Sequence, residues 1–578
     1  MTCKMSMYLK FSTWLMISSL FTTLLSMYIV IYNHNLIIEW EITTTNTAPI
    51  NFIILIDMMS SIFLSTVFFI SAMVIMYSEM YMEHDKTKNR FLILVLFFVL
   101  SMSLLIISPN MISMLLGWDG LGFTSYVLVI YYQNPYSQNA GMITALSNRI
   151  GDAAILLAIA YSMNLGYWNL PTLTMNPETS PMIMLPLLII LASITKSAQI
   201  PFSAWLPMAM AAPTPVSALV HSSTLVTAGV YLSIRFSPII QETISPKMML
   251  LILGTLTMLM AGANANMEMD FKKIIALSTL SQLGLMMMIL STGQFKLTLF
   301  HLITHAMFKS LLFLCAGMMI HNSKNYQDIR AMSKTTMKCP TTSISFSIAS
   351  LALCGFPFTA GFYSKDMIME MTFMNFTNLT TLTLLLIATG MTASYSIRLM
   401  FYLTKSNPLS LTCSPNDKKN KMMTSPILLL TIMATTVGSL LTWFIFPNPE
   451  MICLPLPMKT ATLFTIILGM LLGLILSNIN QKSNMNLYKK FNKYKDLSNT
   501  MWFMKIISST ITINKPLHLG NNLNHIYEKG WAELYGPQGT YNILTKTSAN
   551  MQTYQMNNLK TFLFMFFMWN TIIFISFL

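Results

Sequence analysis

Long apolar windows recur along this chain from end to end, and each is long enough to cross the roughly 30 Å hydrocarbon layer of a membrane as a helix. Short polar or Pro- and Gly-containing breaks separate them. Lipid offers no partner to backbone polar groups, so such windows must be helical. We therefore predict an all-α polytopic membrane protein. About fifteen spans are expected, over residues 11–32, 51–77, 91–108, 110–132, 141–163, 182–206, 214–236, 248–264, 272–292, 295–320, 342–371, 378–403, 426–447, 460–478 and 561–578.

The composition excludes an ordinary soluble protein. Of the 578 residues, 54% are hydrophobic and 9% are charged, and the mean hydropathy is +0.59. A soluble domain has about a quarter of its residues charged and could not bury this much apolar surface in one core. The net charge of +14 does not indicate nucleic-acid binding, because no basic soluble domain with interleaved aromatic residues is present to carry it.

The basic residues fall on one side of the predicted spans. With fifteen spans, the N-terminal side holds Lys86, Lys88, Arg90, Lys324, Arg330, Lys334, Lys338, Lys405, Lys418, Lys419, Lys421 and the lysine-rich stretch from Lys482. The opposite side holds mainly Glu39, Glu41, Glu178, Glu242 and Glu450. This is the positive-inside pattern. In a mitochondrion, the basic side and the N-terminus would face the matrix.

Residues 481–560 differ from the rest of the chain, because their lysines are interleaved with apolar and aromatic residues. We predict an amphipathic helix along the membrane surface, followed by an anchoring helix over 561–578. A flexible tail is the alternative. Against it stand four large aromatic residues, which are uncommon in disordered linkers: Trp502, Tyr527, Trp531 and Tyr535.

Ionisable side chains stand inside the apolar windows. Each costs roughly 3 kcal/mol or more at the centre of a bilayer unless it is paired or hydrated, so each is a candidate functional residue. The candidates are Asp119, Arg149, Asp152, Lys196, His221, His301, His305, Lys309, Lys365 and Asp366.

Three of these residues share one face of one helix. His301, His305 and Lys309 are spaced i, i+4 and i+8. A neutral imidazole accepts a proton at one nitrogen and releases one from the other, and a desolvated lysine exchanges protons more readily, so the spacing suits a proton relay. The two histidines could instead bind zinc, but no third ligand stands nearby in the sequence.

The two remaining lysines lie beside predicted helix breaks. Lys196 precedes Gln199-Ile200-Pro201, and Lys365 follows Gly355-Phe356-Pro357 and Gly361. Freed carbonyl groups and helix ends at a break solvate a lysine that an unbroken helix in lipid could not, and paired broken helices indicate a transport site. A structural ion pair with a carboxylate is the alternative, although few acidic residues lie in the spans.

Other patterns admit simpler interpretations. Arg149 and Asp152 are spaced i, i+3 and could form only a local ion pair. His221, in His-Ser-Ser-Thr, could be a core histidine that neighbouring hydroxyl groups satisfy. The glycines of 117–122 have the wrong order for a nucleotide-binding loop, and the six cysteines form no C-x-x-C pair, so no cofactor or metal site is predicted.

Several motifs, in this order, resemble the antiporter-like membrane subunits of respiratory complex I, chain 5 among them, of the kind that arthropod mitochondrial genomes encode. They are Thr-Lys-Ser-Ala-Gln at 195–199, Ala-Pro-Thr-Pro-Val-Ser-Ala-Leu-Val-His-Ser-Ser-Thr at 212–224, Ser-Gln-Leu-Gly-Leu-Met at 281–286, His-x3-His-x3-Lys at 301–309 and Gly-Phe-Tyr-Ser-Lys-Asp at 361–366. The resemblance covers nearly the whole chain.

The resemblance implies two inverted five-helix repeats with broken helices, over 91–240 and 241–403. Around them it implies N-terminal helices over 1–90, further spans over 404–480, a lateral helix on the matrix side over 481–560 and an anchor over 561–578. It also implies a location in the mitochondrial inner membrane, clamped neighbouring antiporter-like subunits as partners, and bound phospholipids such as cardiolipin. Flavin, iron-sulfur clusters, NADH and ubiquinone would belong to other subunits, whose electron transfer would drive proton translocation here.

The resemblance also implies a role for each candidate residue. Asp119 would pair with Lys196; His221, His301, His305 and Lys309 would form the central hydrophilic axis; Lys365 and Asp366 would form the exit; Arg149 and Asp152 would tune the inlet pair.

Two departures from the family pattern bear on these roles. The acidic position is usually Glu, and Asp119 is one methylene shorter, so its contact with Lys196 is expected to need a water or a small helix shift. Relatives often carry one more N-terminal span, and this chain begins at what would be their second. A stand-alone cation/proton antiporter would share the core motifs but not the segment after residue 480, and a purely structural scaffold would tolerate neutralised lysines.

Overall fold

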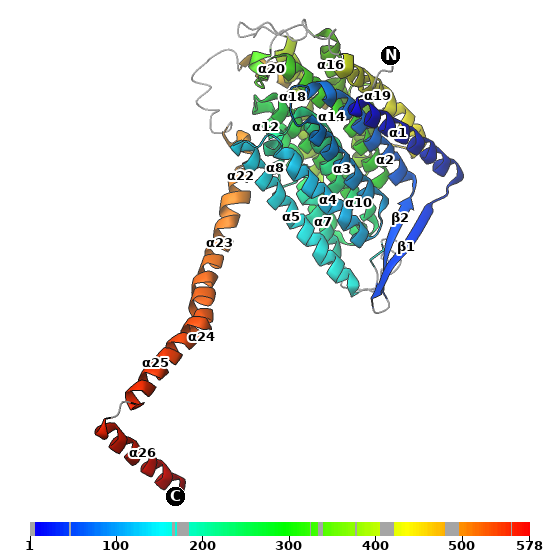
Figure 1. Ribbon diagram of the computed structural model, residues 1–578. Coiled ribbons are helices and arrows are strands. Elements are labelled where there is room, and N and C mark those ends of the chain that lie inside the picture. The colour runs from blue at the N-terminus through cyan, green and yellow to red at the C-terminus, as the bar shows by residue number, and fades with distance from the viewer. Residues whose placement is uncertain are drawn as a thin grey trace. The chain divides into compact units, whose positions relative to one another are not determined.

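The computed structural model describes residues 6–45, 48–164, 168–169, 184–323, 325–332, 339–375, 378–404, 421–479, 496–555 and 558–577. The chain forms two compact units, Met1–Lys505 and Ile506–Leu578. Figure 1 shows the helices of the first unit packed side by side as a bundle.

Thirteen helical segments of the described chain are long and apolar enough to cross a membrane. They are α1 (Met7–Tyr32), α2 (Met58–Tyr81), α3 (Lys88–Ile107), α4 (Met111–Val129), α5 (Pro135–Met163), the joined α9, η2 and α10 (Thr214–Arg235), α12 (Ile244–Met267), α13 (Phe271–Ser291), α14 (Phe295–Asn322), α18 (Leu379–Thr404), α19 (Lys421–Ile445), α20 (Leu456–Ile479) and α26 (Leu559–Phe577). Two shorter apolar helices, α7 (Met184–Lys196) and α16 (Pro340–Cys354), bring these to the fifteen predicted windows. The predicted fold class is confirmed.

A β-hairpin precedes α2, and the sequence analysis missed it. Strands β1 (Leu36–Thr45) and β2 (Ala48–Ile56) pair antiparallel, and Figure 1 shows them at one end of the bundle. The predicted start of the second span at residue 51 is therefore wrong. The strand and the helix form one apolar run, and only the capping box of Asp57 and Ser60 marks the boundary between them.

Two helices are interrupted, as predicted. Helix α7 ends at Lys196, and the chain resumes in α8 (Trp205–Met208) and the short η1 (Ala209–Ala211). Helix α16 ends at Gly355, whose φ of +86° is the left-handed conformation that glycine adopts most easily, and α17 (Ala360–Met374) follows.

A third irregular helix lies between these two. It begins as α9 (Thr214–Val216), widens into the π-helix η2 (Ser217–Thr224) and continues as α10 (Leu225–Arg235). This segment, α13 and α14 are the only spans of the described chain whose most apolar windows are entirely buried, so they form the centre of the bundle. Short α11 (Ser237–Glu242) and η3 (Ile329–Ala331) lie in connections.

The second unit is helical, as predicted for this part of the chain. Its elements are η4 (Ile507–Ile511), α23 (Thr512–Leu523), η5 (Asn524–Ala532), α24 (Glu533–Tyr535), α25 (Pro537–Gln555) and α26, and the short α22 (Met504–Ile506) precedes them in the chain. No residue of η5, α24, α25 or α26 is buried in the described chain. Some residues used in the sidedness prediction lie outside the described residues: Glu178, Lys324, Lys334, Lys338, Lys405, Lys418, Lys419 and Lys482.

Candidate functional site

Lys196 stands at the last turn of α7 and is fully buried. Its Nζ donates a hydrogen bond to the backbone oxygen of Trp118 on α4, at 2.8 Å, and lies 4.2 Å from the centroid of the Trp118 ring. Both contacts stabilise a cation without a carboxylate. No ion pair joins Asp119 to Lys196 in the described chain, so the direct pairing that the family pattern implies is absent from this conformation.

The carboxylates of this half meet Arg149 instead. Arg149 lies 3.1 Å from Asp152 and 3.7 Å from Asp119, so the i, i+3 ion pair is present and a second carboxylate joins it. The Trp118 indole donates a 2.8 Å hydrogen bond to the other oxygen of Asp152. Trp118 therefore connects Lys196 to the carboxylates. The sequence analysis missed this role, because a tryptophan in an apolar helix is typical of simple packing.

Small residues allow these helices to approach. A Cβ on Gly151 of α5 would stand 2.2 Å from the Thr195 hydroxyl of α7, so only glycine fits next to Asp152 and Lys196. A Cβ on Gly229 of α10 would stand 2.6 Å from the backbone oxygen of Ser193. The close contacts hold Lys196 between α4, α5 and α10.

The helix break after Lys196 is satisfied by side chains. The Trp205 indole donates to the backbone oxygen of Thr195 at 3.0 Å. Gln199 accepts a hydrogen bond from Thr257 of α12. The freed carbonyl of Thr195 therefore finds a partner within the protein, as a buried backbone group requires, and the Gln199 side chain ties the break to α12.

His221 lies in the π-helix η2 and is 1% exposed. Its ring stands 6.3 Å from the ring of Trp205, measured between centroids. Neither ring nitrogen has a hydrogen-bond partner in the described structure. The alternative of a core histidine satisfied by neighbouring hydroxyl groups is not supported, because Ser222, Ser223 and Thr224 donate to backbone carbonyls instead.

The predicted trio lies on α14, and all three side chains are fully or almost fully buried. His301 contacts Ser364 at 3.0 Å through Nδ1 and Gln282 at 3.2 Å through Nε2. Lys309 donates a hydrogen bond to the Ser278 hydroxyl of α13. The rings of His301 and His305 stand 6.3 Å apart, and neither nitrogen of His305 has a partner in the described chain.

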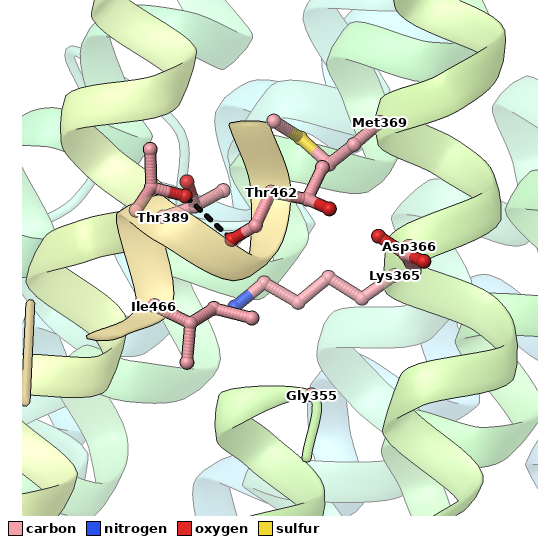
Figure 2. Close-up of a pocket in the computed structure, with 8 residues that line it drawn as sticks. Gly355, Lys365, Asp366, Met369, Thr389, Thr462 and Ile466 are labelled. Atoms are coloured by element: carbon pink, nitrogen blue, oxygen red, sulfur yellow. Dashed lines mark hydrogen bonds between the residues drawn. The ribbon is translucent and has the colours of Figure 1, made fainter. Parts of the chain in front are cut away.

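Lys365 and Asp366 project from α17 toward α20, as Figure 2 shows. Lys365 donates to the Thr392 hydroxyl of α18 at 2.7 Å and contacts the backbone oxygen of Cys354 at 3.4 Å. The two side chains line a cavity of about 10 Å³ between α17, α18 and α20, which is close to the room that one water needs. The broken helix thus supplies one of the oxygen acceptors for Lys365, as predicted.

Seven of the candidates fall into two clusters. The carboxylate cluster contains Asp119, Arg149, Asp152 and Lys196, together with Trp118. The hydroxyl cluster contains His301, Lys309 and Lys365 with their partners Ser278, Gln282, Ser364 and Thr392. Within the described chain, no group of three or more His, Cys, Asp or Glu residues is placed to hold a metal ion, so the two histidines of α14 lack a third ligand.

Two buried cations escaped the sequence analysis. Arg398 of α18 is fully buried and donates to the backbone oxygens of Asn266 and Glu268, and of Ala265 at 3.3 Å. Lys272 contacts the backbone oxygen of Ala212 at 3.4 Å. Arg398 covers the carbonyl groups at the C-terminal end of α12, which is a helix-capping role.

A partly buried ion pair ties α2 to α10. Arg235 binds both carboxylate oxygens of Asp57, at 2.5 and 2.8 Å. Burial raises the pKa of Asp57, but the hydrogen bonds and charge of Arg235, together with Ser60, outweigh that effect and hold this pKa below its ordinary value. The pair anchors the end of the helix that carries His221.

Comparison with protein families matches nearly the whole chain in three segments. Residues 108–392 match the NADH:quinone oxidoreductase/Mrp antiporter transmembrane family. Residues 40–92 match the chain 5 N-terminus of NADH-ubiquinone oxidoreductase (complex I), and residues 395–577 match the C-terminus of NADH dehydrogenase subunit 5.

Individual relatives agree. NADH-ubiquinone oxidoreductase chain 5 of Anopheles quadrimaculatus is 51% identical over 98% of this chain and 97% of its own. The protein of the same name from Locusta migratoria is 49% identical over 93% and 94%, and that from Lumbricus terrestris is 45% identical over 93% and 94%.

Solved structures share the fold. A chain of the Mrp complex from Dietzia sp. DQ12-45-1b superposes with a TM-score of 0.75 at 22% identity, over 94% of this chain and 60% of the other. A chain of an archaeal membrane-bound sulfane sulfur reductase gives 0.61 at 22% identity, over 80% and 93%.

Proposed function

This chain belongs to the chain 5 family of NADH-ubiquinone oxidoreductase, the proton-translocating membrane-arm subunits of respiratory complex I, and on that premise we propose that its buried lysines and histidines are the route of the protons. It is a multi-pass protein of the mitochondrial inner membrane and associates with other membrane-arm subunits. The redox chemistry of the enzyme takes place outside this chain.

One observation carries the proposal: the three buried lysines among the candidates all donate to neutral oxygens. Lys196 donates to a backbone carbonyl, Lys309 to a serine hydroxyl and Lys365 to a threonine hydroxyl. Loss of a proton from a lysine in a tight ion pair would strand a buried carboxylate, which is strongly destabilising. Loss from these lysines leaves only neutral partners, so each can change its protonation state without breaking the fold.

The carboxylate cluster controls the proton affinity of Lys196. A unit charge at about 10 Å, with an effective dielectric constant of about 20, changes the energy of a cation by about 1.7 kcal/mol, more than a tenfold change in its proton affinity. Arg149 holds Asp119 and Asp152 in one cluster, and its side chain is 61% exposed. A change of charge or position in this cluster would therefore shift the proton on Lys196. We propose that this proton passes along the axis of His221, His301, His305 and Lys309 to Lys365. Asp366 would complete the exit.

The arrangement of elements supports two repeats over 91–240 and 241–403. The helices α3, α4, α5, the broken α7 and α8, and α9–α10 form one run of five, and α12, α13, α14, the broken α16 and α17, and α18 form another. The fourth member is broken in each run. An odd number of crossings inverts the second run relative to the first. Residues 1–90 and 404–480 would flank the repeats.

The remaining proposals concern the surroundings of the chain. The positive-inside pattern supports a matrix location for the N-terminus and for the helix of residues 481–560, with residues 561–578 as its anchor. We propose that this helix contacts neighbouring antiporter-like subunits and that phospholipids such as cardiolipin bind the subunit. The match of 395–577 to the chain 5 C-terminus favours this complex over a stand-alone cation/proton antiporter.

The proposal is tested by Lys196→Gln, Lys309→Gln and Lys365→Gln in the assembled complex, measured as protons translocated per electron and as rate. We expect each to lower proton translocation by about tenfold or more, the usual size of a lost acid–base step. Lys421→Gln, an exposed lysine at the start of α19, is the matched control. Normal stoichiometry and rate in all three variants would support the scaffold alternative and refute the route.

A further inference from the structure

The contacts within the hydroxyl cluster leave one step of the route unexplained. Lys309 reaches Ser278 on α13, whereas Lys365 reaches Thr392 on α18. The histidines of α14 do not join them in this structure, because neither nitrogen of His305 has a hydrogen-bond partner in the described chain. A proton on Lys309 therefore needs another group to reach Lys365.

Tyr395 of α18 lies where that group is needed. It is 1% exposed, and its hydroxyl stands 3.4 Å from the Ser281 hydroxyl of α13. The phenol also interacts with the side chains of Ser278 and Gln282. Its oxygen therefore lies beside Ser278 and Gln282, the residues that contact Lys309 and His301. The 3.4 Å contact is long, but a small rotation of either hydroxyl would shorten it to an ordinary hydrogen bond.

The same tyrosine lies one helical turn from the hydroxyl that binds Lys365. Tyr395 follows Thr392 by three residues on α18, so the two side chains share one face, a turn apart. Thr392 is the hydroxyl to which Lys365 donates. Cys354, whose backbone oxygen contacts Lys365, is a neighbour of Tyr395 as well.

We infer that the Tyr395 hydroxyl passes protons between Lys309 and Lys365, a role that rests on the proposed function. The Lys309 ammonium gives a proton to the Ser278 hydroxyl, which releases its own proton to the Tyr395 oxygen. Tyr395 releases its hydroxyl proton through Thr392 to the neutral amine of Lys365. Lys309 ends neutral, Lys365 ends as an ammonium, and every hydroxyl regains its starting form.

A packing role alone does not explain a tyrosine here. The ring would fill the space between α13 and α18 equally well as phenylalanine, whereas a buried phenol must find hydrogen-bond partners to offset its desolvation. Tyr395 finds them on α13, at Ser281 and beside Ser278 and Gln282, which contact Lys309 and His301.

The test is Tyr395→Phe in the assembled complex, which removes one oxygen and keeps the ring. Tyr402→Phe, a buried tyrosine further along α18 and outside the route, is the matched control. We expect Tyr395→Phe to lower proton translocation by about fivefold or more and to raise the solvent deuterium isotope effect on it, with Tyr402→Phe close to wild type. A packing role would leave the isotope effect unchanged.

The lysine variants separate the two proposals. If Lys309→Gln and Lys365→Gln impair translocation while Tyr395→Phe pumps normally with an unchanged isotope effect, the tyrosine step is refuted and the lysine route stands. If the lysine variants also pump normally, the proposed function itself fails. Should Tyr395→Phe not assemble, Ser278→Ala carries the test, because it interrupts the same line one hydroxyl earlier; normal pumping there would equally refute the step.

Discussion

The surroundings of Lys196 differ from those of Lys309 and Lys365. Near Lys196 stand two carboxylates, an arginine that is 61% exposed and a tryptophan that links them to the lysine. Near Lys309 and Lys365 the described hydrogen-bond partners are hydroxyl groups and a backbone carbonyl, all buried. Asp366 lies beside Lys365 in the cavity but forms no ion pair with either lysine in the described chain. The first region is suited to receiving an electrostatic signal from outside the bundle. The second is suited to moving a proton without fixing it.

The largest expected effect comes from giving Lys309 a carboxylate partner. Ser278→Asp would place an anion beside Lys309, hold the lysine as an ammonium and stop its exchange. We expect proton translocation to fall by at least about tenfold while the complex assembles, because the new pair is mutually stabilised. Proton pumping in membrane vesicles gives the measurement.

Ser278→Asn is the control for size and polarity. It should impair translocation less than Ser278→Asp, because a neutral amide oxygen still accepts a hydrogen bond from Lys309 without trapping its charge. Equal effects of the two variants would show that the charge does not matter, and the difference between the two regions would lose its proposed meaning.

A moderate effect is expected in the first region from Trp118→Phe. This change removes the indole hydrogen bond to Asp152 and keeps both the backbone oxygen and an aromatic ring for Lys196. A hydrogen bond to a charged group contributes about 1.5–3 kcal/mol, and about half of that energy reaching Lys196, about 0.7–1.4 kcal/mol, corresponds to a three- to tenfold fall in translocation. Measured pumping rates in the assembled complex report it.

Trp14→Phe on α1, whose side chain is 62% exposed, serves as the control and should pump as wild type does. If Trp118→Phe also pumps normally, Lys196 senses the carboxylates through space and the indole only packs.

The smallest effect is expected where the second half does carry an ion pair, at its surface. The hydrogen bonds and charge of Arg330 hold the pKa of Asp328 below its ordinary value, although burial opposes the shift. Since this pKa is lowered on folding, the pair stabilises the fold above the unfolded value of about 3.9 and the effect is lost as pH falls through the folded pKa.

Asp328→Asn should therefore lower the free energy of unfolding by under about 1 kcal/mol at pH 7, with proton pumping unaffected, because an exposed pair is screened by solvent. Thermal unfolding at pH 7 gives the measurement. A larger loss, or any loss of pumping, would show that acidic groups matter in this half as well.

Sequence reasoning recovers the helices because a membrane imposes a length and an apolar composition that can be read directly. It also locates both breaks, since Gly355 and Pro201 stand where helices end. The strand before α2 could not be found, because residues 51–56 are as apolar as the helix they precede. Orientation of the chain in the membrane and the contacts of residues 481–560 still depend on inference from pattern.

The candidate site is only partly predictable. Charged residues in apolar windows stand out, and the trio on α14 follows from its spacing. Their partners do not stand out: Trp118, Ser278, Thr392 and Tyr395 are ordinary residues for such helices and lie far from the lysines in sequence. The pairing of Asp119 with Arg149 rather than Lys196 depends on the distance between α4 and α5, which spacing along one helix cannot give.

The hydrogen bond from Thr257 to Gln199 has a mechanical consequence. Gln199 belongs to the break in the first run of five helices, and Thr257 to the opening helix of the second. A sideways shift of α12 would therefore move the loop beside Lys196, so this hydrogen bond couples the two runs of five helices mechanically. Loss of this hydrogen bond, with every titratable group left in place, would leave proton transfer within each half intact but uncouple the two halves from each other.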